Sequence, residues 1–371
     1  MIKMAKTGKK KIWVIITSVI CAVVLVVAAV CAWIFIPRHG KMSDETWVSG
    51  DPFDVTKYQT VEKKPGEEFK ILQLADIQLG VPTAKKDTET RVREAIESSN
   101  PDLILLTGDN VEGPLGGWLL PWLCDLIDSY GIPWAPVYGN HERQSVHDLN
   151  WQGDVYESYE NCLFEKGPTT LFGVGNYAFN LTENGKIVYS FIMMDSGGWR
   201  EYTEELGGYD YIKEDQIAWY DWYVRGVSEA VYGEFNPQAG KVVPSICAFH
   251  IPLPEYAEAM KDYVDENGVG APPQTGHNVG ENNENVCCPP INSGLFERAK
   301  ELGSTHAFIA GHDHVNNSVI EYEGIDLAYG YKVTRNNYHD DAFLGYTVIT
   351  MSPDCSELTY EQIPSQIVVE K

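Results

Sequence analysis

Basic residues are scarce in this chain of 371 residues. It carries 28 Lys and Arg against 53 Asp and Glu, which gives a formal net charge of −25 and a pI near 4.7. A surface that binds nucleic acid uses Lys and Arg to neutralise phosphates, so we expect no nucleic-acid-binding surface. The same acidic excess disfavours a folded domain that lies flat on an anionic bilayer.

Paired-cysteine motifs are also missing. None of the eight cysteines has C-x-x-C spacing, so no zinc finger of that type is predicted. Cys247 lies in an apolar run and is expected to be a buried free thiol. The adjacent Cys287 and Cys288 could form disulfides if the domain is exported, and the sequence leaves their pairing open.

The N-terminus holds the longest apolar run. Residues 12–36 contain no charged side chain and follow five lysines within residues 1–11. As a helix this run would span about 37 Å, more than the ~30 Å hydrocarbon core of a bilayer. The lysines favour a cytoplasmic N-terminus, so we predict a single-pass anchor with the rest of the chain extracytoplasmic. A cleaved signal peptide is the alternative, although its apolar core is usually only about 7–15 residues long.

Composition divides the chain into five predicted segments. They are a basic cytoplasmic tail (1–11), a transmembrane anchor (12–36), a linker rich in Pro and Gly (37–66), a folded domain (67–364) and a C-terminal tail (365–371).

The folded domain alternates apolar strand-like runs with segments of helical periodicity. Strands are expected over 69–75, 103–107, 134–138, 176–181, 187–195, 241–249 and 305–310, and helices over 87–99, 115–130, 214–228 and 293–302. Residues 265–290 are expected to form a long loop, and four later runs read as antiparallel strands. This order predicts an α/β fold in which two mixed β-sheets pack face to face and are flanked by helices.

A possible site centres on Asp109. It follows the apolar run 103–107 and Gly108, at the carboxyl end of a predicted strand, where open α/β sheets bind ligands. An aspartate there would by itself more often be a helix cap or a turn residue. Four other predicted strand ends, however, also carry side chains that can bind metal. These side chains are Asp76 and Gln78, Asn140 and His141, His250, and His312 and His314.

Such a set of residues suits a site for two metal ions. Two divalent ions held about 3.5–4 Å apart polarise a phosphoryl oxygen and activate water near neutral pH. They require a shared carboxylate, neutral imidazoles and further oxygen ligands. Gly108, Gly139 and Gly311 precede the candidate ligands and would allow the tight turns that aim them.

The ordered motifs D-x-Q, G-D-N, G-N-H-E, a histidine after a strand, and G-H-D-H resemble those of the calcineurin-like metallophosphoesterase superfamily. Segments 248–256, 291–296 and 311–317 resemble the purple-acid-phosphatase-like branch that includes fungal cell-cycle-regulating phosphatases and their plant relatives. The resemblance covers about residues 68–360, nearly all of the chain after the linker.

The resemblance implies a site with two divalent ions, among Mn, Fe, Zn and Mg. One ion would be bound by Asp76, Asp109 and His314, with Gln78 at the position of a usual histidine; the other would be bound by Asp109, Asn140, His250 and His312. The catalytic set would be His141, Asp109 and Asn140, with His141 touching the phosphoryl oxygen. Metal-bound hydroxide would attack the phosphate monoester of a small phosphorylated molecule in line.

The sequence departs from the family pattern at two positions. Gln78 replaces the usual histidine, and Glu112 stands where true purple acid phosphatases have a tyrosine. An amide oxygen is a harder and weaker ligand than imidazole, so the first metal would be Mn²⁺, Mg²⁺ or Fe²⁺ rather than Zn²⁺, or would bind loosely. Two alternatives therefore stay open. One is a phosphodiesterase acting on a nucleotide or lipid headgroup, and the other is a non-catalytic metal-binding surface module.

Overall fold

The computed structural model describes residues 2–203 and 207–367, which fall into two units divided between residues 38 and 39. The first unit consists mainly of helix α1 (Ile2–Ile34). Within α1, the 22 residues Trp13–Ile34 have a mean hydropathy of 3.1 and are long and apolar enough to cross a membrane.

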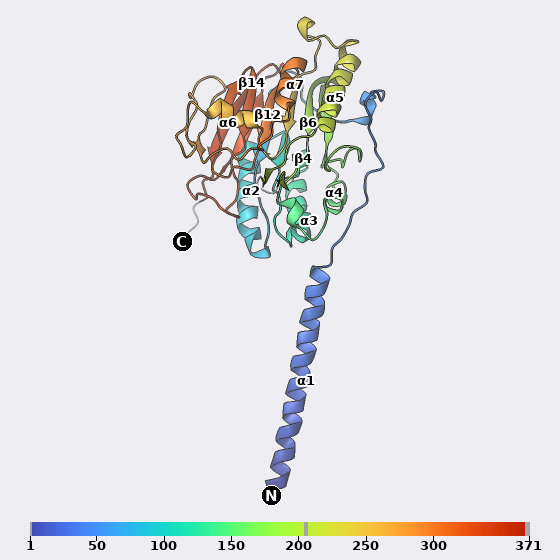
Figure 1. Ribbon diagram of the computed structural model, residues 1–371, viewed down its shortest axis with the longest axis vertical. Coiled ribbons are helices and arrows are strands. Elements are labelled where there is room, and N and C mark those ends of the chain that lie inside the picture. Colours follow the sequence, from blue (N-terminus) through green and yellow to red (C-terminus); the bar gives the residue numbers. More distant parts are fainter. Residues whose placement is uncertain (1, 204–206, 368–371) are drawn as a thin grey trace. The chain divides into compact units, whose positions relative to one another are not determined.

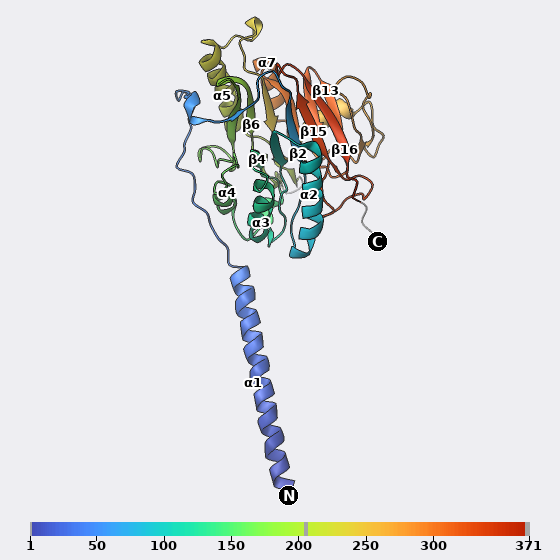
Figure 2. The ribbon, with the colours of Figure 1, turned by 180° about the vertical axis from the view of Figure 1, so that it is seen from behind.

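The second unit is built on two sheets (Figures 1 and 2). Among the described residues, the seven-stranded sheet has the order β1-β5-β6-β9-β12-β14-β13 and the five-stranded sheet the order β16-β15-β2-β3-β4. The first comprises Gln59–Glu62, Tyr177–Glu183, Lys186–Met193, Ser245–Ala248, Thr305–Ala310, Ile325–Tyr329 and Val319–Tyr322 in that order. The second comprises Leu358–Pro364, Gly345–Met351, Phe69–Leu74, Leu103–Thr107 and Trp134–Val137. Both sheets are mixed. In the five-stranded sheet β2, β3 and β4 run parallel, whereas β15 is antiparallel to β2 and to β16. In the seven-stranded sheet β6, β9, β12 and β14 run parallel, whereas β5 is antiparallel to β6 and β13 to β14.

Alternation along the strands explains the layers. In β6, Phe191 and Met193 join the core that contains the five-stranded sheet, whereas Ile192 joins the core that contains helix α5. Helices α2 and α3 contribute to the first core, and α5, α6 and α7 to the second. These helices span Lys85–Ser99, Gly116–Asp128, Glu214–Tyr232, Pro254–Met260 and Leu295–Leu302. The predicted arrangement of two mixed sheets flanked by helices is confirmed.

The segment 37–66 differs from the expected linker. Its residues 59–62 form β1, which pairs in parallel with β5, and Trp47 is buried against the aromatic ring of Trp222 on α5. Phe53 packs beside Gly226, where an added Cβ would collide with its ring. The sequence did not reveal this packing, because the contacts of Trp47 and Phe53 with α5 join positions more than 100 residues apart.

Smaller elements were not predicted from the sequence. Helix α4 (Leu149–Tyr156), helix α6 and the pair β7 (Trp199–Glu201) and β8 (Gly207–Tyr209) have little periodicity, since each is short. The expected loop 265–290 contains a two-residue pairing of β10 (Val269–Gly270) with β11 (Asn282–Asn283). The cysteines are free, and Cys247 is buried as expected.

Candidate metal centre

The strand ends of both sheets meet at one place. Asp76, Asp109 and Asn140 follow β2, β3 and β4 of the five-stranded sheet, while His250 follows β9, and His312 and His314 follow β12, of the seven-stranded sheet. The carboxyl ends of parallel strands lie at the same edge of a sheet, so two packed sheets bring their terminal loops together.

Backbone conformation aims several of these side chains. Asp76, Gln78, Asp109 and His312 have positive φ angles of 54°, 48°, 50° and 84°. Left-handed conformations of non-glycine residues cost about 1–3 kcal/mol each and persist where the surrounding structure imposes them. Here the N–H of Gln78 donates to the carbonyl of Asp109 at 2.7 Å, and the N–H of His312 donates to the Asp76 carboxylate at 3.0 Å.

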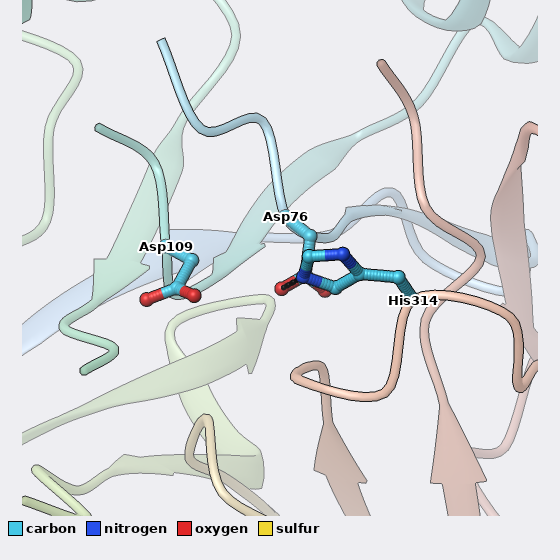
Figure 3. A group of neighbouring side chains, drawn as sticks. All are labelled: Asp76, Asp109 and His314. Carbon is cyan, nitrogen blue, oxygen red and sulfur yellow. Dashed lines mark ion pairs between the residues drawn. The ribbon is translucent and has the colours of Figure 1, made fainter. Parts of the chain in front are cut away.

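Asp76, Asp109 and His314 form one half of the site, with potential ligand atoms that all lie within 4.8 Å of one another (Figure 3). The Nε2 atom of His314 lies 3.5 Å from an Asp76 oxygen. All three residues are buried.

Asn140, His250 and His312 form the other half around Asp109. The Nε2 atom of His250 lies 3.1 Å from the Asn140 side-chain oxygen, 3.2 Å from Nδ1 of His312 and 3.3 Å from Asp109 Oδ2. Two imidazole nitrogens at that separation can share a proton or both face a cation. The side chain of Asp109 thus stands between the two halves.

Charge balance at the site depends on His250. Burial opposes a charge on this imidazole, yet the carboxylates of Asp109 and Asp76 raise the pKa of His250 to about 10. Burial and the neighbouring His250 together lower the pKa of His312 to about 3. Asp109 is fully buried, and although burial alone would favour its neutral form, His250 and His141 lower its pKa. Without a cation, then, a proton on His250 compensates the carboxylates, and a bound metal would displace it.

The outer nitrogen of two histidines is held by a backbone carbonyl. His250 Nδ1 lies 2.8 Å from the oxygen of Thr107, and His314 Nδ1 lies 2.8 Å from the oxygen of Tyr338. A carbonyl only accepts, so each Nδ1 carries a proton, and each Nε2 is the nitrogen that can face a ligand, in His250 after loss of its second proton.

Glu142 ties two site loops together. It lies in the short 3₁₀ helix η3 (Glu142–Gln144) and is fully buried. Its two carboxylate oxygens accept the N–H of Asn110 at 2.6 Å and the N–H of Gly139 at 2.8 Å. The loops that carry Asp109 and Asn140 are therefore joined through one carboxylate.

The side chain of Gln78 is oriented by a buried lysine. Lys332 follows β14, is 1% exposed, and donates to Gln78 Oε1 at 2.6 Å and to the carbonyl of Asp76 at 2.9 Å. The amide nitrogen of Gln78 then faces Asp109 Oδ2 at 3.3 Å. Burial lowers the pKa of Lys332 to about 8, against the pull of the Asp76 and Asp109 carboxylates.

His141 lies at the open side of the site. Its backbone N–H donates to Asp109 Oδ1 at 2.8 Å, and its ring Nε2 lies 3.7 Å from Asp109 Oδ2. Its side chain is 21% exposed, in contrast to the fully buried His250. An imidazole that borders both the site and solvent can contact a bound substrate.

The 265–290 segment braces the turn that carries His312 and His314. The Asn316 side-chain oxygen accepts the N–H of Asn283 at 2.9 Å, and buried Asp313 accepts the N–H of Cys287 at 3.2 Å. Burial raises the pKa of Asp313 to about 7. The length of this segment thus has a structural use beside the site.

These residues fit divalent metal ions. The donor set comprises two carboxylates, one amide oxygen and three imidazoles, which suit Mn²⁺, Fe²⁺ or Zn²⁺. Glycines keep the space open: a Cβ on Gly139 would collide with the Asp109 carboxylate, and one on Gly108 would lie 2.6 Å from the His250 ring.

The sequence profile of calcineurin-like phosphoesterases matches residues 69–316. This chain belongs to the calcineurin-like phosphoesterase family. The match begins at β2 and extends past the turn that carries His312 and His314, so it includes every strand end described above.

Relatives of this phosphoesterase come from plants and yeast. "Probable inactive purple acid phosphatase 28" of Arabidopsis thaliana is 30% identical over 73% of this chain and 73% of its own length. "Phosphatase DCR2" of Saccharomyces cerevisiae is 29% identical over 73% of this chain and 48% of its own length. A solved dimetal phosphatase from Danio rerio is 12% identical, covers 80% of this chain and 99% of its own, and has a TM-score of 0.43.

The sequence pattern did not single out two supporting residues of this phosphoesterase. Glu142 was visible only as part of the G-N-H-E motif, and Lys332 belonged to no motif. A lysine three residues after an apolar strand was the one available signal for Lys332, and it does not distinguish a buried side chain from an exposed one.

Proposed function

We propose that the chain is a membrane-anchored, binuclear metal-dependent phosphoesterase that hydrolyses phosphate monoesters. The observation that carries this proposal is the meeting of six candidate ligands from two sheets, with the carboxylate of Asp109 at their centre. All but the half-buried Asn140 are buried, and the outer nitrogens of His250 and His314 are already occupied by backbone carbonyls.

One metal would be bound by Asp76, Asp109 and His314, and the other by Asp109, Asn140, His250 and His312. Bound divalent ions polarise a phosphoryl oxygen and make water a stronger nucleophile near neutral pH. Around them, the protein orients the ligands: Glu142 fixes two of the ligand loops through the N–H groups of Asn110 and Gly139.

His141 has the position of a substrate-contacting group. Its ring stands between Asp109 Oδ2 at 3.7 Å and Glu112 Oε2 at 3.8 Å, at the exposed side of the ligand cluster. From there its imidazole can donate a hydrogen bond to a phosphoryl oxygen or a proton to the leaving oxygen. The buried histidines have no comparable access, because their side chains are at most 6% exposed.

The choice of monoesters is supported by the word phosphatase in the names of the plant and yeast relatives. The test is to strip the purified full chain of metal, reload it with Mn²⁺, Fe²⁺, Zn²⁺ or Mg²⁺, and measure hydrolysis of p-nitrophenyl phosphate and bis(p-nitrophenyl) phosphate. We expect turnover of the monoester, and its loss in Asp109→Asn. Faster diester hydrolysis would make the chain a phosphodiesterase, and no hydrolysis with any ion would leave a non-catalytic metal-binding module.

The membrane part of the proposal comes from Trp13–Ile34, which has the length and hydropathy of a membrane span. The lysines at positions 3, 6, 9, 10 and 11 favour a cytoplasmic N-terminus, which would place the phosphoesterase domain outside. The measurement is membrane fractionation of the full chain with an alkaline wash, followed by protease accessibility of the intact cells. Release of the domain by the wash, or protection from added protease, would contradict this topology.

A further inference from the structure

The two halves of the site offer unequal numbers of ligands. Asp109, Asn140, His250 and His312 converge in one half, with separations of 3.1–3.3 Å about His250 Nε2. The other half holds Asp76, Asp109 and His314. Whether Gln78 completes this second set depends on which atom of its amide faces inward.

Lys332 decides that orientation. An ammonium group only donates hydrogen bonds, so the Gln78 atom 2.6 Å from Lys332 Nζ must be the oxygen. The second contact of Lys332, to the carbonyl of Asp76 at 2.9 Å, keeps the ammonium in place. The NH₂ group of Gln78 is thereby directed at Asp109 Oδ2, 3.3 Å away. An amide NH₂ has no lone pair to offer a cation.

We propose that Lys332 is a positioning residue that keeps Gln78 a hydrogen-bond donor to Asp109 rather than a metal ligand, so that the site binds its two cations in sequence. The first cation binds tightly among Asp109, Asn140, His250 and His312. The second binds more weakly between Asp76 and His314. This inference rests on the metal centre of the proposed function and adds to it the order of loading.

The packing around Lys332 keeps this residue beside Gln78. Its backbone runs beside the end of β2, where Val333 N donates to the carbonyl of Ala75 at 3.2 Å. The acidic groups that face its ammonium are Asp76, Asp109 and Glu112. A cation between Asp76 and His314 would add positive charge close to this ammonium, which is a second reason for weaker binding there.

The test is a titration of the metal-free full chain with Mn²⁺, followed by electron paramagnetic resonance and by metal analysis after equilibrium dialysis. In the wild type we expect one tight equivalent with an uncoupled mononuclear signal. A spin-coupled pair should appear only at a Mn²⁺ concentration at least about tenfold higher, the scale on which single ligand-shell changes alter metal affinity.

Two variants isolate the role of Lys332. Lys332→Met frees the Gln78 amide to turn its oxygen inward. The Mn²⁺ affinity of the weak step should then rise by about tenfold and approach that of the tight step. Gln78→Leu combined with Lys332→Met leaves an apolar pair and no unpaired charge. It removes the same ammonium charge without offering a ligand, so its weak step should persist and should tighten less than in Lys332→Met alone. Lys63→Met is the matched control: Lys63 is 2% exposed and bonded to Glu183 at 2.9 Å on the β1 side, and its loss should leave both steps unchanged.

Each outcome has a separate meaning. Two equally tight steps in the wild type, or loss of the weak step in the double variant, would overturn the inference, since Gln78 would then be a ligand. The same holds if Lys332→Met behaves like Lys63→Met. Absence of any bound Mn²⁺ would instead refute the metal centre itself, and with it the proposed function.

Discussion

Replacing Glu142 with glutamine should weaken both the fold and the metal centre. Glu142→Gln keeps the shape of the side chain but turns one acceptor oxygen into an NH₂ group. Both carboxylate oxygens are in use, one by the N–H of Asn110 at 2.6 Å and the other by the N–H of Gly139 at 2.8 Å. One of these two backbone donors must therefore lose its partner in a site that is fully buried.

The expected magnitude follows from these two bonds. A hydrogen bond to a charged group contributes about 1.5–3 kcal/mol, and an unsatisfied buried donor costs about 1–3 kcal/mol. Burial and the nearby Asp109 carboxylate raise the pKa of Glu142 to about 8, so the charged acceptor is compared with the amide above pH 8, where the neutral amide also removes some repulsion. We expect a net loss of about 2 kcal/mol in the free energy of unfolding. Because the loops of Asp109 and Asn140 lose their link, metal affinity should fall by about 10–100-fold.

Urea unfolding in the presence of a chelator measures the first effect, and Mn²⁺ titration of the folded variant measures the second. Asp326→Asn is the control, since Asp326 is also buried and accepts from Tyr360 at 2.8 Å, away from the metal ligands. The control should lose stability and keep its metal affinity. If Glu142→Gln unfolds like the wild type and binds Mn²⁺ equally well, the proposed link between the loops is wrong.

Three further predictions concern catalysis, metal removal and pH. His141→Ala should lower hydrolysis of p-nitrophenyl phosphate by about 10²–10⁴-fold, the usual contribution of a general acid, with metal content by elemental analysis unchanged. Chelation should stop hydrolysis and lower the free energy of unfolding by about 2.7 kcal/mol relative to protein held in metal at 100 times its dissociation constant, while circular dichroism stays native. Burial works against the charge of Asp148, but the N–H groups of Gly40 and Trp151 lower its pKa. A carboxylate with a depressed folded pKa stabilises above its unfolded value of about 3.9 and loses that effect as pH falls through the folded pKa. Asp148→Ala should therefore cost about 1 kcal/mol in urea unfolding at pH 7, through loss of the α4 cap, and less below pH 4; an equal cost at both pH values would contradict this account.

Much of the site could be predicted because its residues follow the strongest apolar runs. Strands such as Leu103–Thr107 are buried along their whole length, and their ends are marked by Gly108 and Gly311. Local pattern thus indicates where each ligand stands along the chain. It does not indicate that β2, β3 and β4 belong to one sheet while β9 and β12 belong to the other, because strand order depends on pairing between distant segments.

The features that the sequence did not reveal are set by long-range contacts. Lys332 lies 254 positions from Gln78, and no periodicity connects them. The aromatic residues of segment 37–66 likewise find their partners on α5, as Phe53 does in packing edge-on against Trp222. Short elements such as α6 escape for a different reason, since seven residues give too few positions to define an apolar face.

The residues with positive φ angles indicate what holds the candidate ligands in place. Asp76, Asp109 and His312 would each gain about 1–3 kcal/mol by relaxing to ordinary conformations, so contacts with the surrounding structure must hold them. Hydrogen bonds between the loops supply that restraint, including the one from His312 N to the Asp76 carboxylate at 3.0 Å. The proton on His250 supplies the missing positive charge. Hydrogen bonds between the loops therefore aim the ligands, and a bound cation would take the place of the His250 proton as the positive charge beside the carboxylates.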